Sequence, residues 1–318
     1  MVEDRRSSAC PILLKRDFVS GRLGKQRNAD PRPSINGDST ADDAMRAYFL
    51  KKVEDPQYDW KQPINFYGKV VDESNHPVVG ATVIFGWVDL SPTTYSTTEA
   101  KSDESGLFSL LNRTGKGLSV KINKEGYYFS RGEVARHFEY ANPADGLHKP
   151  DPNNPVIYHL RKRGLGSDLI TSQYGIRTDF PISIPRDGTA LTVDLMERKA
   201  GSLGQIHISQ QKPEHVAWKQ ATNWFFKMEI PDGGFVEHND EFPFEAPESY
   251  YQAIVEFRFD KDDPTWALDL KKSYYIRFGN PPRYGRLQIE TGISQGGVIL
   301  TYAINPSGSR NLEPKENQ

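Results

Sequence analysis

The feature that most constrains this chain is an alternation of apolar and polar residues with a period of two. In the segment 63–72, Ile64, Phe66 and Val70 alternate with polar neighbours, and the segment 251–259 alternates over five apolar positions. Such a pattern is typical of half-buried β-strands. Clusters of Gly, Pro, Asn and Asp separate the segments, which favours antiparallel strands joined by short turns. The sequence therefore predicts an all-β fold.

A length of 318 residues leaves room for about two domains. We expect a disordered leader, a helical brace, a seven-stranded-type antiparallel β-sandwich, a second β-sandwich and a tail, at residues 1–38, 39–62, 63–163, 164–305 and 306–318. A jelly roll is one candidate topology for the second sandwich. Within it, the turn 185–188 between two apolar runs predicts a hairpin over 180–195.

One helix is expected, in the segment that begins at Ser39 or Thr40. Either residue can cap the helix, and Asp55-Pro56 ends it. Acidic residues in its first turn and Lys51 and Lys52 in its last suit the helix dipole. Its apolar residues predict that it packs on the first sandwich.

Composition excludes several functions. The formal net charge of −2 lacks the basic excess of a dedicated nucleic-acid binder. Cys10 is the single cysteine, so no intramolecular disulfide and no cysteine-based zinc cluster can form. No apolar run is long enough to span a membrane. No cofactor is expected.

Three ordered blocks carry a family resemblance, namely GKVVDESNHPVVGATV at 68–83, SDESGLFSL at 102–110 and GLSVKINKEGYY at 117–128. They resemble the carboxypeptidase regulatory-like domain, a relative of the transthyretin fold, and cover about a third of the chain. Gly80 and Gly106 stand where turns require positive φ. The resemblance implies a non-catalytic companion domain. The ending YAINPSGSRNLEP resembles that of uncharacterised bacterial proteins carrying such a domain, which implies no activity.

The chain departs from the short form of that domain between Tyr127 and the last expected strand. The segment 128–155 is a long loop inside a compact domain, and such loops are usually functional. Arg136, His137 and Tyr140 are its candidate binding residues. An ordered, purely structural excursion is the alternative.

No catalytic motif stands out. Residues 292–296 spell GISQG like a nucleophile elbow, yet they join two expected strands and no histidine lies beyond His238, so a hairpin turn is favoured. The histidines lack the spacing of a helical metal site. The acidic clusters 238–241 and 260–263 offer oxygen ligands for calcium without EF-hand spacing, which favours solvated turns.

Aromatic residues crowd the C-terminal half. Tyr250 and Tyr275 are expected to face away from their core-facing neighbours, and with Trp266 and Tyr284 they form a candidate platform for stacking on sugars. Ordinary sandwich packing is the alternative interpretation.

Two functions follow from these observations. The first is a non-catalytic binding or scaffold protein of the cell envelope that recognises carbohydrate or a protein surface. The second is a glycosidase-like hydrolase with a carboxylate pair in the C-terminal sandwich. The resemblance implies an extracytoplasmic location, whereas the sequence as given contains no signal peptide, so localisation stays open.

Overall fold

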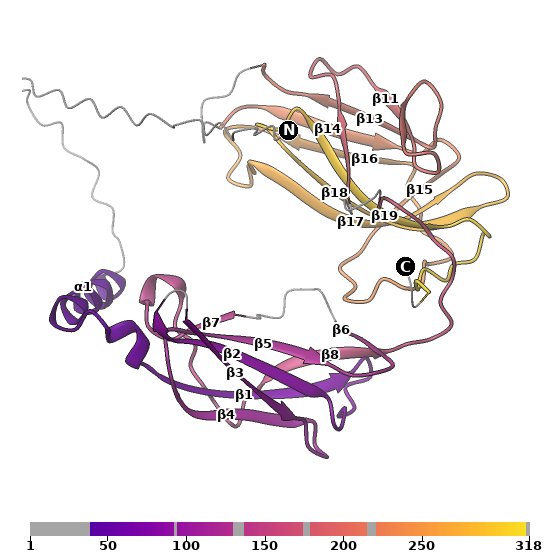
Figure 1. The fold of residues 1–318 in the computed structure, drawn as a ribbon. Helices are drawn as coiled ribbons and strands as arrows, with labels where there is room; N and C mark the ends of the chain where they lie inside the picture. The colour runs from indigo at the N-terminus through magenta and orange to yellow at the C-terminus, as the bar shows by residue number, and fades with distance from the viewer. Residues whose placement is uncertain (1–38, 92–93, 130–136, 174–178, 215–220, 316–318) are drawn as a thin grey trace, which may run out of the picture.

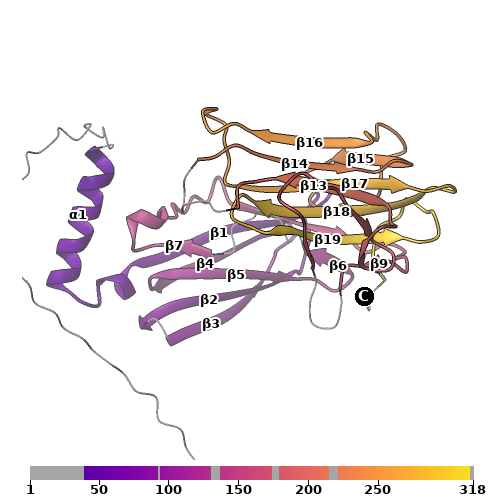
Figure 2. The same cartoon turned by 90° about the horizontal axis from the view of Figure 1, so that it is seen from above.

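A computed structural model of the chain describes residues 39–91, 94–129, 137–173, 179–214 and 221–315 (Figure 1). The chain is all-β with one N-terminal helix, as predicted, and its strands form two separate sandwiches (Figures 1 and 2). The expected leader 1–38 lies outside the described residues. Among the described helices, none has the length and apolar character needed to cross a membrane.

The first sandwich packs the sheet β4-β1-β8-β6 against the sheet β3-β2-β5-β7. Its strands are β1 Pro63–Asp72, β2 Thr82–Ser91, β3 Thr94–Lys101, β4 Leu107–Thr114, β5 Gly117–Asn123, β6 Tyr127–Phe129, β7 His137–Glu139 and β8 Val156–Lys162. Phe66 of β1 lies at the centre of the core, with its ring 4.7–6.3 Å from those of Phe85, Phe108 and Phe138. The alternation predicted for β1 is confirmed, because Ile64, Phe66 and Val70 are fully buried.

Among the named strands of the first sandwich that the structure describes, one pair departs from an antiparallel arrangement. Strands β1 and β8 are parallel, with Val70 opposite Tyr158. A parallel pair needs a long crossover, and here the chain passes through the facing sheet between the two strands. The expected loop 128–155 is part of that path and contains the end of β6, the whole of β7 and the 3₁₀ turn η2 (Pro143–Asp145).

The second sandwich packs the sheet β10-β19-β18-β17-β15, with β9 paired to β19, against the sheet β12-β11-β13-β14-β16. Its strands are β9 Ile170–Thr171, β10 Phe180–Ser183, β11 Leu191–Asp194, β12 Lys199–Gly201, β13 Ile206–Gln211, β14 Trp224–Glu229, β15 Gly233–Glu237, β16 Ile254–Phe259, β17 Asp269–Phe278, β18 Arg283–Gly292 and β19 Gly297–Asn305. Consecutive strands β17, β18 and β19 are neighbours in one sheet, which is a meander and not a jelly roll.

The hairpin predicted over 180–195 is wrong. Strand β10 pairs with β19, whereas β11 pairs with β13 in the facing sheet. The turn at 185–188 therefore crosses between layers. Both strands bury their alternating residues in the same core from opposite sides, so alternation alone does not distinguish a crossing from a hairpin. By contrast, GISQG does join β18 to β19 as the predicted hairpin turn.

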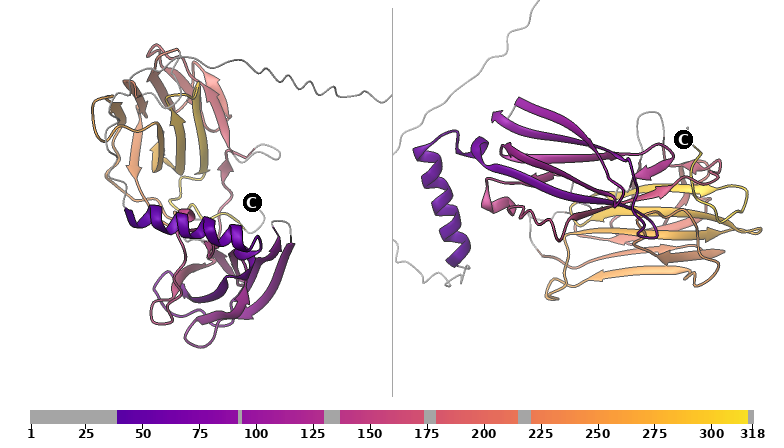
Figure 3. Two further views of the ribbon diagram at one scale, coloured as in Figure 1. Left: turned by 90° about the vertical axis from the view of Figure 1, so that its left-hand side faces the viewer. Right: turned by 90° about the horizontal axis from the view of Figure 1, so that it is seen from below.

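The helix α1 spans Ser39–Glu54, as predicted, but it contacts the body through few residues. Its buried Tyr48 donates a hydrogen bond to Asp59 Oδ1 at 3.0 Å, and Lys52 Nζ lies 2.9 Å from Asp59 Oδ2. Asp59 belongs to the 3₁₀ turn η1 (Tyr58–Lys61), and α1 also packs against η2. Phe49 and Leu50, expected to pack on the sandwich, are exposed instead. Figure 3 shows the helix across one end of the first sandwich.

The segment expected as a tail is a strap between the sandwiches. Leu312 is fully buried, and its amide donates to the carbonyl oxygen of Phe244 at 2.8 Å. Glu313 accepts hydrogen bonds from the amides of Gly164 and Ser167 at 2.6 and 2.7 Å, through its side chain and its carbonyl oxygen respectively. The strap therefore ties the linker between the domains to the second sandwich.

Gly106 lies in the turn that leads into β4, and a substitution there tests whether this turn requires glycine. Its φ is 75°, and a Cβ there would lie 2.3 Å from the carbonyl oxygen of Val70. We expect Gly106→Ala to lower the free energy of unfolding by about 2–3 kcal/mol in urea titrations, from backbone strain plus this clash. Gly126→Ala is the control, because Gly126 also has a φ of 75° but open space around it. Equal losses in both variants would contradict a contribution from the clash.

Candidate functional site

The cleft between the two sandwiches brings together polar side chains from both. It has a volume of about 560 Å³ and is lined by Glu73, Asn75, His159, Arg161, Asp240, Glu241, Phe242, Glu245 and Tyr275. The first four come from the turn after β1 and from β8, and the others come from the segment after β15 and from β17. Four carboxylates face one guanidinium, so the cleft is acidic. Ligand sites occur preferentially at domain interfaces of this kind.

A contact between a histidine and a carboxylate links the two walls of the cleft. His159 Nδ1 of β8 lies 2.9 Å from Glu241 Oε2 of the second sandwich. His159 faces outward from β8 because its neighbours Tyr158 and Leu160 are buried in the first core. Alternation along one strand therefore places this imidazole in the cleft.

Tyr275 forms part of the cleft floor. Its side chain is 5% exposed, and its hydroxyl donates to Asp240 Oδ2 at 2.5 Å. The ring of His238 stacks on it with centroids 4.2 Å apart. Burial, and then the hydrogen bond to Asp240, raise the pKa of Tyr275, so the phenol stays protonated and fixes the Asp240 carboxylate at the cleft.

His238 supports this arrangement as a neutral imidazole. Burial lowers its pKa, with Arg286 acting in the same direction and Asp240 opposing it. Its Nδ1 accepts a hydrogen bond from the amide of Asp240 at 3.2 Å. The turn 238–241 is therefore held by its own histidine and by Tyr275, and it presents Asp240 and Glu241 to the cleft.

Phe244 joins the sandwiches beside the cleft. The guanidinium of Arg161 from β8 lies 5.2 Å from its ring centroid, and that of Arg286 from β18 lies 5.3 Å away. Tyr128 of β6 packs edge-on against the same ring at 4.9 Å, and its hydroxyl donates to the carbonyl oxygen of Pro314 in the strap. We call Phe244, Arg161, Arg286 and Tyr128 the clasp. It sets the distance between the two walls of the cleft.

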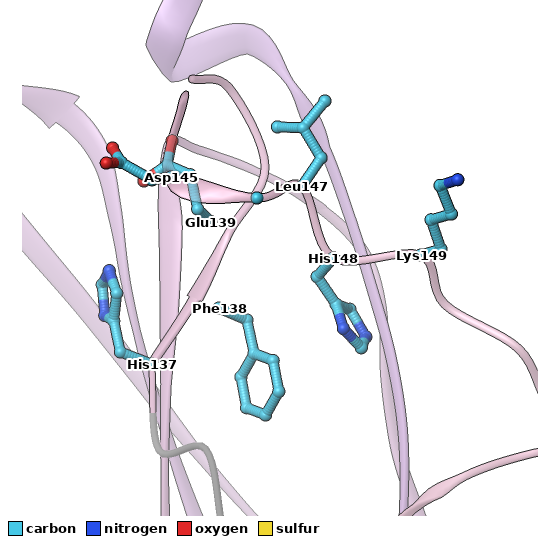
Figure 4. A pocket seen from close by; sticks show the side chains of 8 residues that line it. His137, Phe138, Glu139, Asp145, Leu147, His148 and Lys149 are labelled. Atoms are coloured by element: carbon cyan, nitrogen blue, oxygen red, sulfur yellow. The ribbon is translucent and has the colours of Figure 1, made fainter. Parts of the chain in front are cut away.

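The expected binding loop forms a second hollow. It also has a volume of about 560 Å³ and is lined by His137, Phe138, Glu139, Asp145, Gly146, Leu147, His148 and Lys149. Figure 4 shows His137 and His148 on either side of Phe138. All of these residues come from one segment of the chain, and Glu139 Oε1 is already occupied by the amides of Ala141 and Asn142.

The imidazole of His148 in this second hollow turns toward the core. The ring of His148 lies 4.7–5.6 Å from those of Phe66, Phe138 and Tyr140, and burial lowers its pKa. Tyr140, expected to be a binding residue, is buried and donates to the carbonyl oxygen of Asn65 at 2.7 Å. His137 does line the hollow, whereas Arg136 lies outside the described residues. The hollow therefore offers a ligand fewer converging polar groups than the cleft.

The aromatic platform expected on the second sandwich does not form. Tyr275 is buried instead of exposed, and Tyr250 is 88% exposed at a position with a φ of 70°. Trp266 packs on the core and donates its indole N–H to the carbonyl oxygen of Thr222 at 2.9 Å. Tyr284 packs against Tyr251. Trp266, Tyr275 and Tyr284 serve packing at separate places, Tyr250 is exposed, and of these four residues only Tyr275 lines the cleft.

The strand predicted over 251–259 begins later in the structure, which accounts for part of the difference between the expected and the observed positions of these aromatic residues. Strand β16 begins at Ile254, and Val255, Phe257 and Phe259 pack on the second core as predicted. Tyr251 instead joins a small separate cluster with Ala246 and Leu312. Tyr250, which directly precedes this segment, has a positive φ, and Ala253 is exposed, so the alternation holds only from Val255 to Phe259.

Most cleft residues were missed by the sequence because its two walls lie about 80 residues apart or more. Two local signals pointed to cleft residues, namely Tyr275, expected in an exposed aromatic platform, and the acidic cluster 238–241, interpreted as a solvated turn. Within the described part of the chain, no group of three or more His, Cys, Asp or Glu side chains is arranged to hold a metal ion.

Comparisons with known proteins identify no family. No protein-family description matches the chain, and no curated protein matches it. Among solved structures, it is similar to the 3-chlorocatechol 1,2-dioxygenase of Rhodococcus opacus 1CP, with 16% identity and a TM-score of 0.24. That match covers 32% of this chain and 61% of the dioxygenase chain, which is less than two thirds of its length.

Proposed function

We propose that the protein is a non-catalytic binding protein whose interdomain cleft takes a hydroxyl-rich ligand, such as a short glycan. The observation that carries the proposal is the composition of the cleft, which is lined by planar polar side chains from both sandwiches together with the ring of Phe242. Carboxylates, an amide and a guanidinium form hydrogen bonds with neighbouring hydroxyls. Phe242 supplies the apolar surface on which a sugar ring stacks.

The charge of the cleft limits the classes of ligand that we expect it to bind. Four carboxylates outnumber the single guanidinium of Arg161, so acidic glycans are disfavoured by repulsion. We propose neutral or amino sugars as the preferred class. We also propose that residues 63–163 are a regulatory-like domain, on the three sequence blocks given above, and that the protein works outside the cytoplasm.

A glycan array probed with the full chain tests the proposal. We expect saturable binding to neutral or amino glycans, and Phe242→Ala should weaken it about tenfold through lost stacking, about 1.4 kcal/mol. Tyr250→Ala is the control, because Tyr250 is exposed and does not line the cleft. Loss of binding in the Tyr250 variant alone would contradict the cleft as the site. If no glycan binds, the carbohydrate ligand is wrong, and a pull-down for protein partners of the cleft follows.

A hydrolase is the second candidate, because Glu73, Asp240, Glu241 and Glu245 all line the cleft. Glycoside hydrolysis needs one carboxyl group kept protonated by a raised pKa. Asp240 accepts a hydrogen bond from the Tyr275 hydroxyl, and Glu241 lies against His159 Nδ1. Two of the four carboxylates are thus engaged by protein side chains, and we place the hydrolase second on that ground. Release of reducing sugar from a glycan bound on the array would instead support the hydrolase.

A further inference from the structure

The outer face of α1 carries an apolar patch that none of the residues described in the structure covers. Phe49, Leu50 and Val53 are 58%, 60% and 81% exposed, whereas Tyr48 and Lys52 turn toward η1. Residues three or four apart lie on one side of a helix, so the three side chains form one outward stripe. Three large exposed apolar side chains on a single helix are typical of an interaction surface.

The charged residues at the two ends of this stripe have opposite signs. Arg46 lies four residues before Leu50 and Glu54 four residues after it, each about 6 Å along the helix axis. Eight residues separate Arg46 from Glu54, so within one chain the two side chains are too far apart to pair. Among the described residues, neither makes an ion pair.

A pair of α1 helices related by a two-fold axis through Leu50 covers the apolar stripe and pairs the two charged side chains. In an antiparallel pair of α1 helices, Leu50 of one copy packs on Leu50 of the other, and Phe49 and Val53 flank this contact. Arg46 of each copy then meets Glu54 of the second copy. Contacts related by a two-fold axis are self-complementary in this way. From this geometry we infer that the protein forms a homodimer through α1.

The position of α1 allows this association. The helix stands across one end of the first sandwich, where the figures show its long side open to approach (Figures 2 and 3). The cleft is lined by other parts of the chain, so the dimer is independent of the ligand proposed for it. A single pair of 16-residue helices buries less than about 1,000 Å², which is below the size of a standard stable interface, so we expect a weak dimer.

Sedimentation velocity of the full chain over a hundredfold range of concentration tests this inference. We expect the wild-type protein to shift from monomer to dimer, and Leu50→Glu to remain monomeric at every concentration. Leu203→Glu is the matched control, because Leu203 is 82% exposed on the second sandwich, and it should dimerise like the wild type. Far-UV circular dichroism and the thermal transition check that each variant keeps its fold.

A charge exchange tests the antiparallel register itself. Arg46→Glu alone and Glu54→Arg alone should each weaken the dimer several-fold, since each places like charges together. The double variant should recover the wild-type dissociation constant because the pair is restored with its signs reversed. A wild-type chain that stays monomeric at all concentrations would overturn the inference. A dimer indifferent to Leu50→Glu, or a double variant no tighter than the single ones, would do so as well.

Discussion

Raising the pH from 7.5 to 9.5 is expected to stabilise the second sandwich by about 2 kcal/mol through a single buried lysine. Lys212 follows β13 and is buried, and burial, with a smaller contribution from Arg186, lowers its pKa to about 8 from 10.5. A lysine whose pKa is lower in the folded than in the unfolded state binds fewer protons when folded between these two values. Stability therefore rises with pH across this window, by at most about 3 kcal/mol.

The contacts of its amino group show what Lys212 contributes to the fold, although burying this group costs stability. Its Nζ donates to Thr291 Oγ1 at 3.0 Å and to the carbonyl oxygen of Gly292 at 2.8 Å. It also lies over the ring of Trp224 at 5.2 Å. These acceptors belong to the end of β18 and to the turn that leads into β19. Lys212 thus fixes the turn whose sequence resembles a nucleophile elbow, and its role there is structural.

Urea titrations at half-unit steps of pH, on wild type and Lys212→Met, measure the effect. The wild type should gain about 2 kcal/mol relative to the variant between pH 7.5 and 9.5. Buried tyrosines set the upper limit, because burial raises the pKa of Tyr302 to about 12 and that of Tyr274 further, so stability falls as the pH passes the ordinary value of 10. Parallel curves for both proteins across the window would contradict the assignment.

The fold was predictable where a residue's neighbours in sequence decide its environment. Ile64, Phe66 and Val70 alternate with polar residues on one strand, so their burial follows from period two alone. The positive φ values of Gly80 and Gly106 were likewise predictable, since the turn chemistry is local. The helix boundaries followed from a cap and a proline for the same reason.

What the sequence could not indicate depends on contacts between distant segments. Tyr275 was expected to be exposed because it alternates with Tyr274, and both are buried, since β17 has the core on one face and the segment 238–246 on the other. The role of the strap was hidden in the same way, because Leu312 is buried against Ala246 and Tyr275, which lie far earlier in the chain. An alternation with a period of two shows which residues share a face of a strand, but it does not show whether one face or both faces are buried.

Replacing Phe244 with alanine is expected to separate the two sandwiches without unfolding either one. Phe244 is 9% exposed, and its ring contacts Arg161 and Tyr128 of the first sandwich and Arg286 of the second. Removing a buried phenylalanine side chain costs about 3–5 kcal/mol. Here most of that loss falls on the interface, because Phe244 belongs to neither of the two large cores.

Calorimetry and small-angle scattering report the separation directly. Wild type should unfold with the sandwiches coupled, whereas Phe244→Ala should show two transitions and a larger radius of gyration. Phe257→Ala is the control, since Phe257 packs half-buried on the second core and should lower the stability of that sandwich alone. A variant with one unshifted transition and an unchanged radius would contradict the clasp.

The Phe244→Ala variant also tests whether ligand binding in the cleft depends on the interface between the two sandwiches. Glu73, Asn75 and His159 reach the cleft from one sandwich, and Asp240 and Phe242 from the other. A ligand that contacts both sets binds tightly only while the clasp holds the walls at a fixed distance, because otherwise binding must also order the two domains. Phe244→Ala should therefore lose ligand affinity although it leaves every cleft residue unchanged. Retained affinity in a variant whose domains have separated would place the ligand on one sandwich alone.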